Sequence, residues 1–312
     1  MLTPIYNYGI EKNNYSTFRK SVMKKSNIVL IFNGLGNQMS QYAFYLAMHD
    51  RMPNTKYICW DNDHNGYELE RLFGIRKHKS PINLLLSRTL ICQRDYWWIK
   101  IIKKFLATIG FEAINENLNY RYTTTHSLSS NRITFWYGGW HNYRYFNSID
   151  SKLRDVFRFP EQKLNVYSSE LLSLIQITHS VGIHIRRGDY LQGENRKLYG
   201  DICTISYYKQ SIEYIKKLVS KPRFFIFSND AEWVQNNLDI SSAVYVNDNT
   251  GSDSWMDMFL MSKCKNLIIA NSTFSWWGAY LSNANNILCP TRFINDKNSG
   301  EIYPDTWTRI ES

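Results

Sequence analysis

Residues 181–190 read VGIHIRRGDY, a short apolar strand that runs directly into a polar loop. Alternate side chains of a strand share a face, so His184 and Arg186 are expected opposite the valine and isoleucine side chains. Two arginines, a histidine and an aspartate at the carboxyl end of a strand suit a diphosphate, because guanidinium groups present a rigid fork of donors to phosphate oxygens. The alternative is a salt-bridged sheet edge. The neighbouring Gly188 makes us favour the diphosphate.

Strands and helices alternate on both sides of this stretch. Apolar runs predict strands at residues 27–32, 133–137, 223–227, 243–246, 267–270 and 287–288. Apolar residues at helical spacing predict helices that follow a glycine turn at residues 33–36, that carry residues 208–219, and that begin near residues 231, 255 and 274. Such alternation predicts a parallel sheet covered on both faces, with ligands at the carboxyl ends of its strands.

Length and composition narrow the class of protein. The 312 residues fit two domains, and the apolar (44%) and charged (21%) fractions are those of a globular chain. Aromatic residues (15%) suit sites that stack on sugars or bases. No run could span a bilayer, and the first 27 residues lack the apolar core of a secretory signal. Five scattered cysteines argue against a disulfide framework or structural zinc and favour the cytoplasm.

Three further loops carry polar residues that could bind a ligand. Residues 271–275 (NSTFS) open a helix after a strand, where they could cap the helix or bind an anion, and both roles stay open. Residues 34–38 (GLGNQ) also join a strand to a helix, but they lack the third glycine of the dinucleotide fingerprint, which disfavours an NAD(P) enzyme. Residues 61–63 (DND) are similar to the DxD metal motif, although an ordinary acidic loop is the favoured reading.

Taken together, these blocks resemble the α-1,2-fucosyltransferases of glycosyltransferase family 11. The resemblance runs from about residue 27 to about residue 310, and residues 1–26 fall outside it as an N-terminal extension. It is strongest in GLGNQMSQYAF (34–44), HIRRGDY (184–190) and NSTFSWWGAYL (271–281). Supporting matches are HNGYEL (64–69), YGGWHNYRYF (137–146), FSND (227–230) and WMDMFLMSKCKN (255–266).

The resemblance implies an α/β, GT-B-like glycosyltransferase with two Rossmann-like domains facing across a cleft. Residues 27–175 would form the acceptor-side domain and residues 176–312 the GDP-fucose-binding domain, with a C-terminal segment that can pack back on the first domain. The implied reaction is inverting transfer of L-fucose from GDP-β-L-fucose to the 2-hydroxyl of a terminal β-galactoside. GDP-fucose is then a substrate, with no cofactor or metal required. The setting would be synthesis of a bacterial surface glycan, such as O-antigen or capsule, on a lipid carrier.

The resemblance also assigns residues to the donor. The expected GDP-fucose-binding set is Gly34, Gly36, Asn37, Gln38, His184, Arg186, Arg187, Asp257, Ser272, Thr273, Phe274 and Ser275. Within it, Arg186 would hold the pyrophosphate and Arg187 would support the loop. His184 and Asp257 would lie near the guanine. Hydroxyls of the 271–275 turn would meet the phosphates, and the 34–38 turn would close over the sugar-phosphate.

The chemistry needs stabilised charge and a place for a proton. The leaving GDP gains negative charge as its glycosidic bond breaks, and Arg186 could stabilise that charge. The acceptor hydroxyl must lose a proton, for which Asp189 and Glu194 are both candidates. Weak or no base catalysis also stays open, as does a fucosyltransferase of different linkage.

The net charge of +10 suggests an anionic partner. Its excess is partly local, with eight bases and one acid between residues 76 and 104. This stretch contains IKIIKKFLATIGF (99–111), a predicted basic amphipathic helix. With the preceding Trp98, its apolar set is Trp98, Ile101, Ile102, Phe105 and Ile109. The helix could lie on the inner face of the plasma membrane as a weak peripheral contact, or pack its apolar stripe on the domain core, which we favour. A non-catalytic basic protein that binds membranes or nucleic acid is the alternative class. We expect no nucleic-acid partner, because the basic residues gather away from the pocket-like loops.

Overall fold

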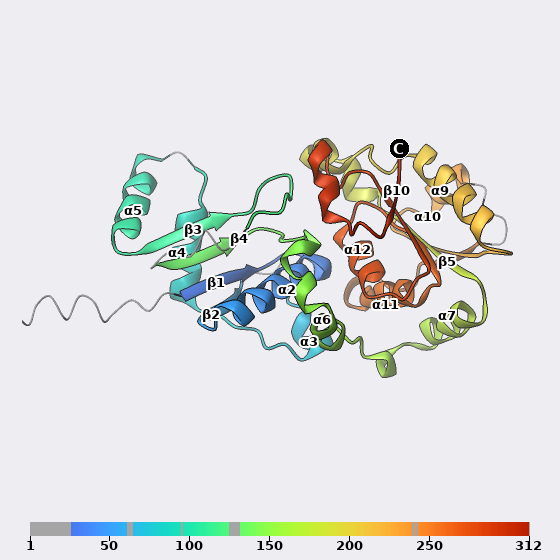
Figure 1. The fold of residues 1–312 in the computed structure, drawn as a ribbon, viewed down its shortest axis with the longest axis horizontal. Helices are drawn as coiled ribbons and strands as arrows, with labels where there is room; N and C mark the ends of the chain where they lie inside the picture. The colour runs from blue at the N-terminus through green and yellow to red at the C-terminus, as the bar shows by residue number, and fades with distance from the viewer. Residues whose placement is uncertain are drawn as a thin grey trace, which may run out of the picture.

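Two separate parallel sheets organise the chain, each with its own helices (Figure 1). The computed structural model describes residues 26–60, 65–94, 96–124, 132–238, 240 and 243–311. The first sheet has the order β2-β1-β4-β3. Its strands are β1 (Ser26–Ile31), β2 (Thr55–Cys59), β3 (Phe111–Asn115) and β4 (Ile133–Tyr137).

The second sheet has the order β10-β9-β8-β5-β6-β7 and is also parallel throughout. Its strands are β5 (Ser180–Ile185), β6 (Arg223–Ser228), β7 (Val244–Val246), β8 (Asn266–Ile268), β9 (Asn286–Pro290) and β10 (Thr308–Ile310). In the register, Ile183 lies between Ile226 and Ile268. Strand β10 adds the C-terminal residues to this second sheet, while the segment before it reaches the first domain through an Arg121–Glu301 ion pair.

Helices connect the strands and cover the sheets. They are α2 (Leu35–Arg51), α3 (Leu69–Phe73), α4 (Pro81–Ile91), α5 (Trp97–Thr108), α6 (Asp150–Val156), α7 (Val166–Ile177), α8 (Gly193–Tyr199), α9 (Ile205–Leu218), α10 (Ala231–Asn237), α11 (Trp255–Lys263) and α12 (Thr273–Tyr280). Short 3₁₀ turns are η2 (Tyr143–Tyr145), η3 (Asn147–Ile149), η4 (Glu161–Lys163), η5 (Gly188–Leu191), η6 (Gly251–Asp253) and η7 (Lys297–Ile302). Several helices begin where a polar side chain accepts a hydrogen bond from a first-turn N–H, as Thr204 and Asp230 do.

The predicted alternation along β5 is confirmed. Val181, Ile183 and Ile185 are buried in one cluster with α9, whereas His184 points to the opposite side of the sheet. The other six predicted strands are also present, β4 with the expected ends and the rest with shifted ends, but β2, β3 and β10 were not predicted. Strand β3 was missed because the helix expected over 99–111 ends at residue 108. Gly110, with a φ of +95°, then turns the chain into the strand.

Helix α5 does not pack as expected. The stripe that we assigned to the domain core is exposed, and the helix packs through Ile99 and Leu106 instead. The favoured interpretation of this stripe was therefore wrong, because a second and narrower apolar stripe on the same helix makes the contact.

Helix α7 associates with the second sheet, although the expected boundary at residues 175/176 separates most of it from that domain. It packs against α11. The Tyr167 hydroxyl donates to the carbonyl of Tyr245 in β7, and Ser168 bonds to Asn249. The chain crosses between the domains before this helix, close to α6 (Figure 1).

The two domains meet most closely where α2 contacts α12. A Cβ at Gly36 would lie 2.7 Å from the carbonyl carbon of Thr273, so only glycine permits this approach. One turn later, the Trp277 indole N–H donates to the Ser40 hydroxyl at 2.9 Å. The Trp277 ring also stacks on Phe146. The N-termini of two helices from different domains are therefore locked side by side.

We expect Gly36→Ala to lower the free energy of unfolding by about 1–3 kcal/mol, because the added methyl group must displace backbone rather than a flexible side chain. Urea denaturation followed by circular dichroism measures the effect. Asn37→Ala is the matched control, since Asn37 lies on the same helical turn and is partly exposed. Equal urea midpoints for Gly36→Ala and the wild type would contradict the close packing.

Candidate active site

A cavity of about 840 Å³ lies between the two sheets, at the carboxyl ends of strands from both. This volume is within the range of small-molecule sites, and the position is the one expected for ligands of parallel sheets. Its first-domain wall comes from the loops after β1, β3 and β4, and includes Gly34, Gly36, Asn37, Glu116, Gly138 and His141. Its second-domain wall comes from the loops after β5, β6, β7 and β8, and includes His184, Arg186, Asp189, Asn249, Asp257, Ser272, Thr273 and Phe274.

The two arginines of the β5 loop have different surroundings. Arg186 lines the cavity, where its Nε lies 2.9 Å from an Asp189 carboxylate oxygen. Arg187 turns away and is absent from the cavity lining. Its guanidinium donates to Asp230 at 3.1 Å and lies 3.8 Å from the centre of the Trp233 ring. Arg186 can therefore meet an anion in the cavity, whereas Arg187 anchors the loop. Arg187 was also expected among the donor-binding residues, and this is a correction, because its guanidinium is directed to Asp230 and Trp233.

A half-buried acid and a buried imidazole line the second-domain wall. Burial raises the pKa of Asp257 to about 7, although Asn249 donates to its Oδ1 at 2.7 Å. Burial, with the Arg186 charge nearby, lowers the pKa of His184 to about 3, so this ring is neutral. The His184 ring lies 5.6 Å from the Phe274 ring, and its Nδ1 has no hydrogen-bond partner among the described residues. A carboxylic acid, a neutral imidazole that can donate and accept hydrogen bonds, and an aromatic face suit a planar heterocycle such as a nucleobase.

The N-termini of α2 and α12 supply positive potential to the same cavity. Each helix carries partial positive charge at this end, which favours phosphate. Ser272, Thr273 and Phe274 line the cavity at the start of α12, and the Ser272 hydroxyl accepts from the Phe274 N–H. Ser275 does not reach it, because its side chain is fully buried and donates to the Ala270 carbonyl.

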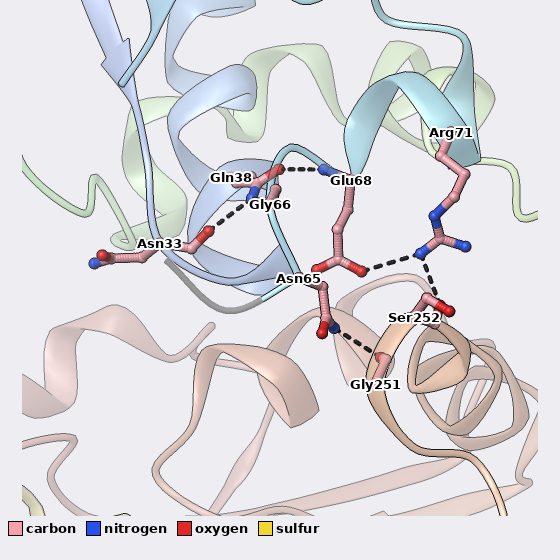
Figure 2. A network of polar contacts seen from close by, with 8 residues as sticks. All are labelled: Asn33, Gln38, Asn65, Gly66, Glu68, Arg71, Gly251 and Ser252. Carbon is pink, nitrogen blue, oxygen red and sulfur yellow. Dashed lines mark hydrogen bonds and ion pairs between the residues drawn. The ribbon is translucent and has the colours of Figure 1, made fainter. Parts of the chain in front are cut away.

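Gln38 is also directed away from the cavity. Figure 2 shows its amide bridging two loops of the first domain. The NH₂ group donates to the carbonyls of Asn33 and Gly66, at 2.6 and 2.7 Å, while Oε1 accepts from the Glu68 N–H. These bonds use the donors of the amide, so Gln38 shapes the glycine turn that lines the cavity.

A second inter-domain contact closes one edge of this region (Figure 2). Asn65 donates from its side chain to the Gly251 carbonyl at 2.7 Å, and Arg71 donates to the Ser252 carbonyl at the same distance. The Arg71 guanidinium is also paired with the Glu68 carboxylate. Side chains of the first domain therefore donate hydrogen bonds to a backbone turn of the second domain.

Glu116 is the chemically distinctive group that sequence reasoning missed. It follows β3 directly and lines the cavity from the first domain. Oε2 accepts from the Trp140 N–H at 2.7 Å, while the buried Oε1 has no partner among the described residues. Burial raises its pKa to about 8, against the opposing effect of backbone hydrogen bonds from Trp140 and Gly139. The available signal was the polar run NEN (115–117) after an apolar segment.

The two carboxylates proposed as bases from sequence lie in less suitable places. Asp189 lines the cavity but is ion-paired with Arg186. Glu194 lies on α8 with its side chain 83% exposed, 2.7 Å from Lys197, and is absent from the cavity lining. The DND loop at 61–63 falls outside the described residues. Within the described ranges, no group of three or more metal-ligating side chains gathers.

Comparisons with known proteins find matches over nearly the whole chain. The model of the family "Glycosyl transferase family 11" matches residues 6–311. An "Alpha-1,2-colitosyltransferase" of Escherichia coli is 34% identical and aligns over 91% of this chain and 98% of its own. A "Galactoside alpha-(1,2)-fucosyltransferase 1" of Plecturocebus brunneus is 26% identical over 52% of this chain and 46% of its own.

Solved structures show the fold. The fucosyltransferase NodZ from Bradyrhizobium superposes with a TM-score of 0.50 at 12% identity, covering 83% of this chain and 93% of its own. A mutant of Arabidopsis thaliana FUT1 in complex with GDP gives the same TM-score and identity, covering 85% and 70%. Together with the two parallel-sheet domains around a cavity, these likenesses show the expected GT-B architecture.

The raised pKa of Asp257 makes a prediction about nucleotide binding. If this carboxylate accepts hydrogen bonds from the guanine edge, only its ionised form binds well. Affinity for GDP-fucose should then fall about tenfold per pH unit as the pH drops below 7. Calorimetric titration between pH 5.5 and 8.5 measures this, and the sugar diphosphate itself does not titrate in that range.

Asp257→Asn should bind weakly with no such pH dependence, whereas Glu116→Gln should retain it. A pH-independent affinity in the wild type would remove Asp257 from the guanine site.

Proposed function

The chain belongs to glycosyltransferase family 11, and on this premise we propose that it transfers L-fucose from GDP-β-L-fucose to the 2-hydroxyl of a terminal β-galactoside, with inversion. One observation carries the proposal: a single cavity combines an anion-binding region, made by Arg186 and the starts of α2 and α12, with a carboxylate oxygen of Glu116 that is buried and has no hydrogen-bond partner among the described residues. The former suits a nucleotide diphosphate and the latter suits a hydroxyl that must lose its proton. The α-1,2 linkage is common to the names of two relatives.

The donor would lie along the second-domain wall. Asp257, His184 and Phe274 would take the guanine. Arg186 and the starts of α2 and α12 would surround the diphosphate, with the 34–37 turn over its sugar end. These fixed charges and dipoles would stabilise the negative charge that develops on GDP, without a metal ion.

The acceptor would enter on the first-domain side, where Glu116 would be the base. As the 2-hydroxyl oxygen bonds to the anomeric carbon, its proton passes to Oε1 of Glu116. The bond from the anomeric carbon to the phosphate oxygen breaks, and its electron pair leaves with GDP. A raised pKa makes this carboxylate a stronger base than an exposed one, and Asp189 stays free to orient Arg186.

One relative favours a second donor. Colitose is L-fucose without its 3-hydroxyl, and the colitosyltransferase aligns over 91% of this chain. A site that hydrogen-bonds the 3-hydroxyl would strongly reject the deoxy sugar, whereas a site with no such contact would accept both. For the pathway, a second relative is named "O-antigen biosynthesis glycosyltransferase WbnK", of Escherichia coli, which supports a role in surface-glycan synthesis.

A donor and acceptor matrix tests the reaction. GDP-fucose and GDP-colitose are each incubated with lactose, Galβ1-3GalNAc, Galβ1-3GlcNAc and Galβ1-4GlcNAc, and the product linkage is read by NMR. We expect an α-1,2-linked product, no product from acceptors methylated at the galactose 2-oxygen, and unchanged rates in EDTA. Another linkage, or loss in EDTA with rescue by Mn²⁺, would overturn that part of the proposal.

Glu116→Gln should lower kcat by about 10²–10⁴ while leaving the Kd for GDP-fucose unchanged, because it removes the base and keeps the Trp140 contact. In the wild type, kcat/KM should rise with pH up to about 8. Steady-state kinetics and calorimetry measure both.

The same substitution should raise Tm at pH 8. A carboxyl whose pKa is raised in the folded state contributes stability below its ordinary pKa, and this is lost as the pH rises toward 8; neutral Gln escapes the loss. Glu194→Gln is the control and should match the wild type in rate. A full loss in Glu194→Gln with normal turnover in Glu116→Gln would reverse the assignment.

A further inference from the structure

The outer end of the first domain carries a large exposed apolar surface, here called the α4–α5 apolar face. It consists of Trp97, Trp98, Ile101, Ile102, Phe105 and Ile109 of α5, with exposed fractions from 39% to 73%, and the adjoining helix α4 exposes Ile82 and Leu85. Isolated exposed apolar residues are ordinary, but two tryptophans, a phenylalanine and several isoleucines on one helix are not. Such a surface indicates an interaction site.

The geometry of α5 separates three strips along the helix. Ile99 and Leu106 are buried and attach the helix to its domain. Trp97, Ile101 and Phe105 recur every four residues, so they form a continuous exposed ridge. Lys100 and Lys104 also recur at four residues and lie on the opposite flank of that ridge from the remaining apolar residues.

The charged residues within helices α4 and α5 are all basic. Helix α5 carries Lys100, Lys103 and Lys104, helix α4 carries Arg88, and neither helix contains an acidic residue. Lys103 is used locally, donating to the Cys92 carbonyl. A second copy of the chain on this face would bring two lysine rows together, whereas an anionic surface would neutralise them.

We propose that the α4–α5 apolar face seats this protein on an anionic lipid bilayer, with α5 lying in the plane of the interface. Aromatic and aliphatic side chains would enter the headgroup boundary, where tryptophan is favoured, and the lysines would meet lipid phosphates. None of the described helices is long and apolar enough to cross a membrane. This contact does not depend on which sugar is transferred.

The position of the α4–α5 apolar face relates the proposed membrane contact to the approach of the acceptor. Helix α5 lies at the end of the first domain that is remote from the second domain (Figure 1). The connection between α4 and α5 contributes Gln93 to the cavity lining, and Leu118, which is 90% exposed and two residues after Glu116, also lines it. A lipid-borne glycan held at the bilayer would therefore approach from the Glu116 side.

Vesicle sedimentation tests the proposal with the full chain. Wild-type protein is mixed with phosphatidylglycerol–phosphatidylethanolamine vesicles, or with phosphatidylcholine vesicles, at 50 and 500 mM NaCl. We expect at least about tenfold stronger binding to the anionic vesicles at low salt, and weakening at high salt. Trp97→Ser/Ile101→Ser/Phe105→Ser and Lys100→Glu/Lys104→Glu should each reduce binding at least about tenfold.

The control removes equally exposed apolar side chains from helices of the second domain. Val166→Ser/Ile177→Ser/Leu218→Ser, at residues 78%, 80% and 54% exposed, should bind like the wild type. All variants should retain transfer to a soluble acceptor, because none of the changed residues lines the cavity. Wild-type protein that stays in the supernatant at low salt would overturn the proposal. So would a serine triple variant that binds normally, or a stable dimer in sedimentation velocity that this variant dissociates.

Discussion

The contact between Gly36 and the backbone of Thr273 is the constraint on which the site depends. It joins the first turns of α2 and α12, so the positive ends of two helices from different domains face one cavity. A side chain at residue 36 would separate these ends, and the anion-binding wall would lose half of its dipoles. The Asn65–Gly251 bond holds another edge of the same interface through a backbone carbonyl. The cavity is thus a product of inter-domain packing more than of either domain alone.

The charged groups of the cavity are placed to suit the two parts of the proposed transfer, departure of the diphosphate and loss of the acceptor's proton. Arg186 and the helix ends place positive potential in the region where a leaving diphosphate would gain charge. Glu116 lies in the other domain, where its Oε2 accepts from the Trp140 N–H and burial raises its pKa to about 8. Asp189, by contrast, forms an ion pair with Arg186. Two carboxylates of one cavity therefore acquire different roles from their environments.

Sequence reasoning succeeded where a residue's role follows from strand geometry. Alternation along β5 placed His184 on the cavity side, opposite Val181, Ile183 and Ile185, and Arg186, the residue after the strand, also lines the cavity. It failed where a backbone turn determines the start of a strand or the direction of a side chain. Glu116 was hidden because β3 starts just after α5 and is only half-buried, so its pattern merges with that of the helix. Gln38 and Ser275 belong to strong motifs, yet a motif gives the position of a residue and not the direction of its side chain. Gln38 bonds to the backbone of two first-domain loops, and Ser275 bonds within its own loop.

Helix α5 is a further case in which the sequence pattern alone could not predict the packing. Its sequence contains two apolar stripes, and periodicity could not say which one packs; the narrower Ile99–Leu106 stripe does. The wider stripe then remains in water, where a patch of this kind promotes aggregation unless something covers it. A bilayer would cover it, and because the connection between α4 and α5 contributes Gln93 to the cavity wall, this wall would face the membrane side. Seated in this way, the first domain would hold the acceptor side at the membrane, and the second would stay free to exchange a water-soluble nucleotide sugar.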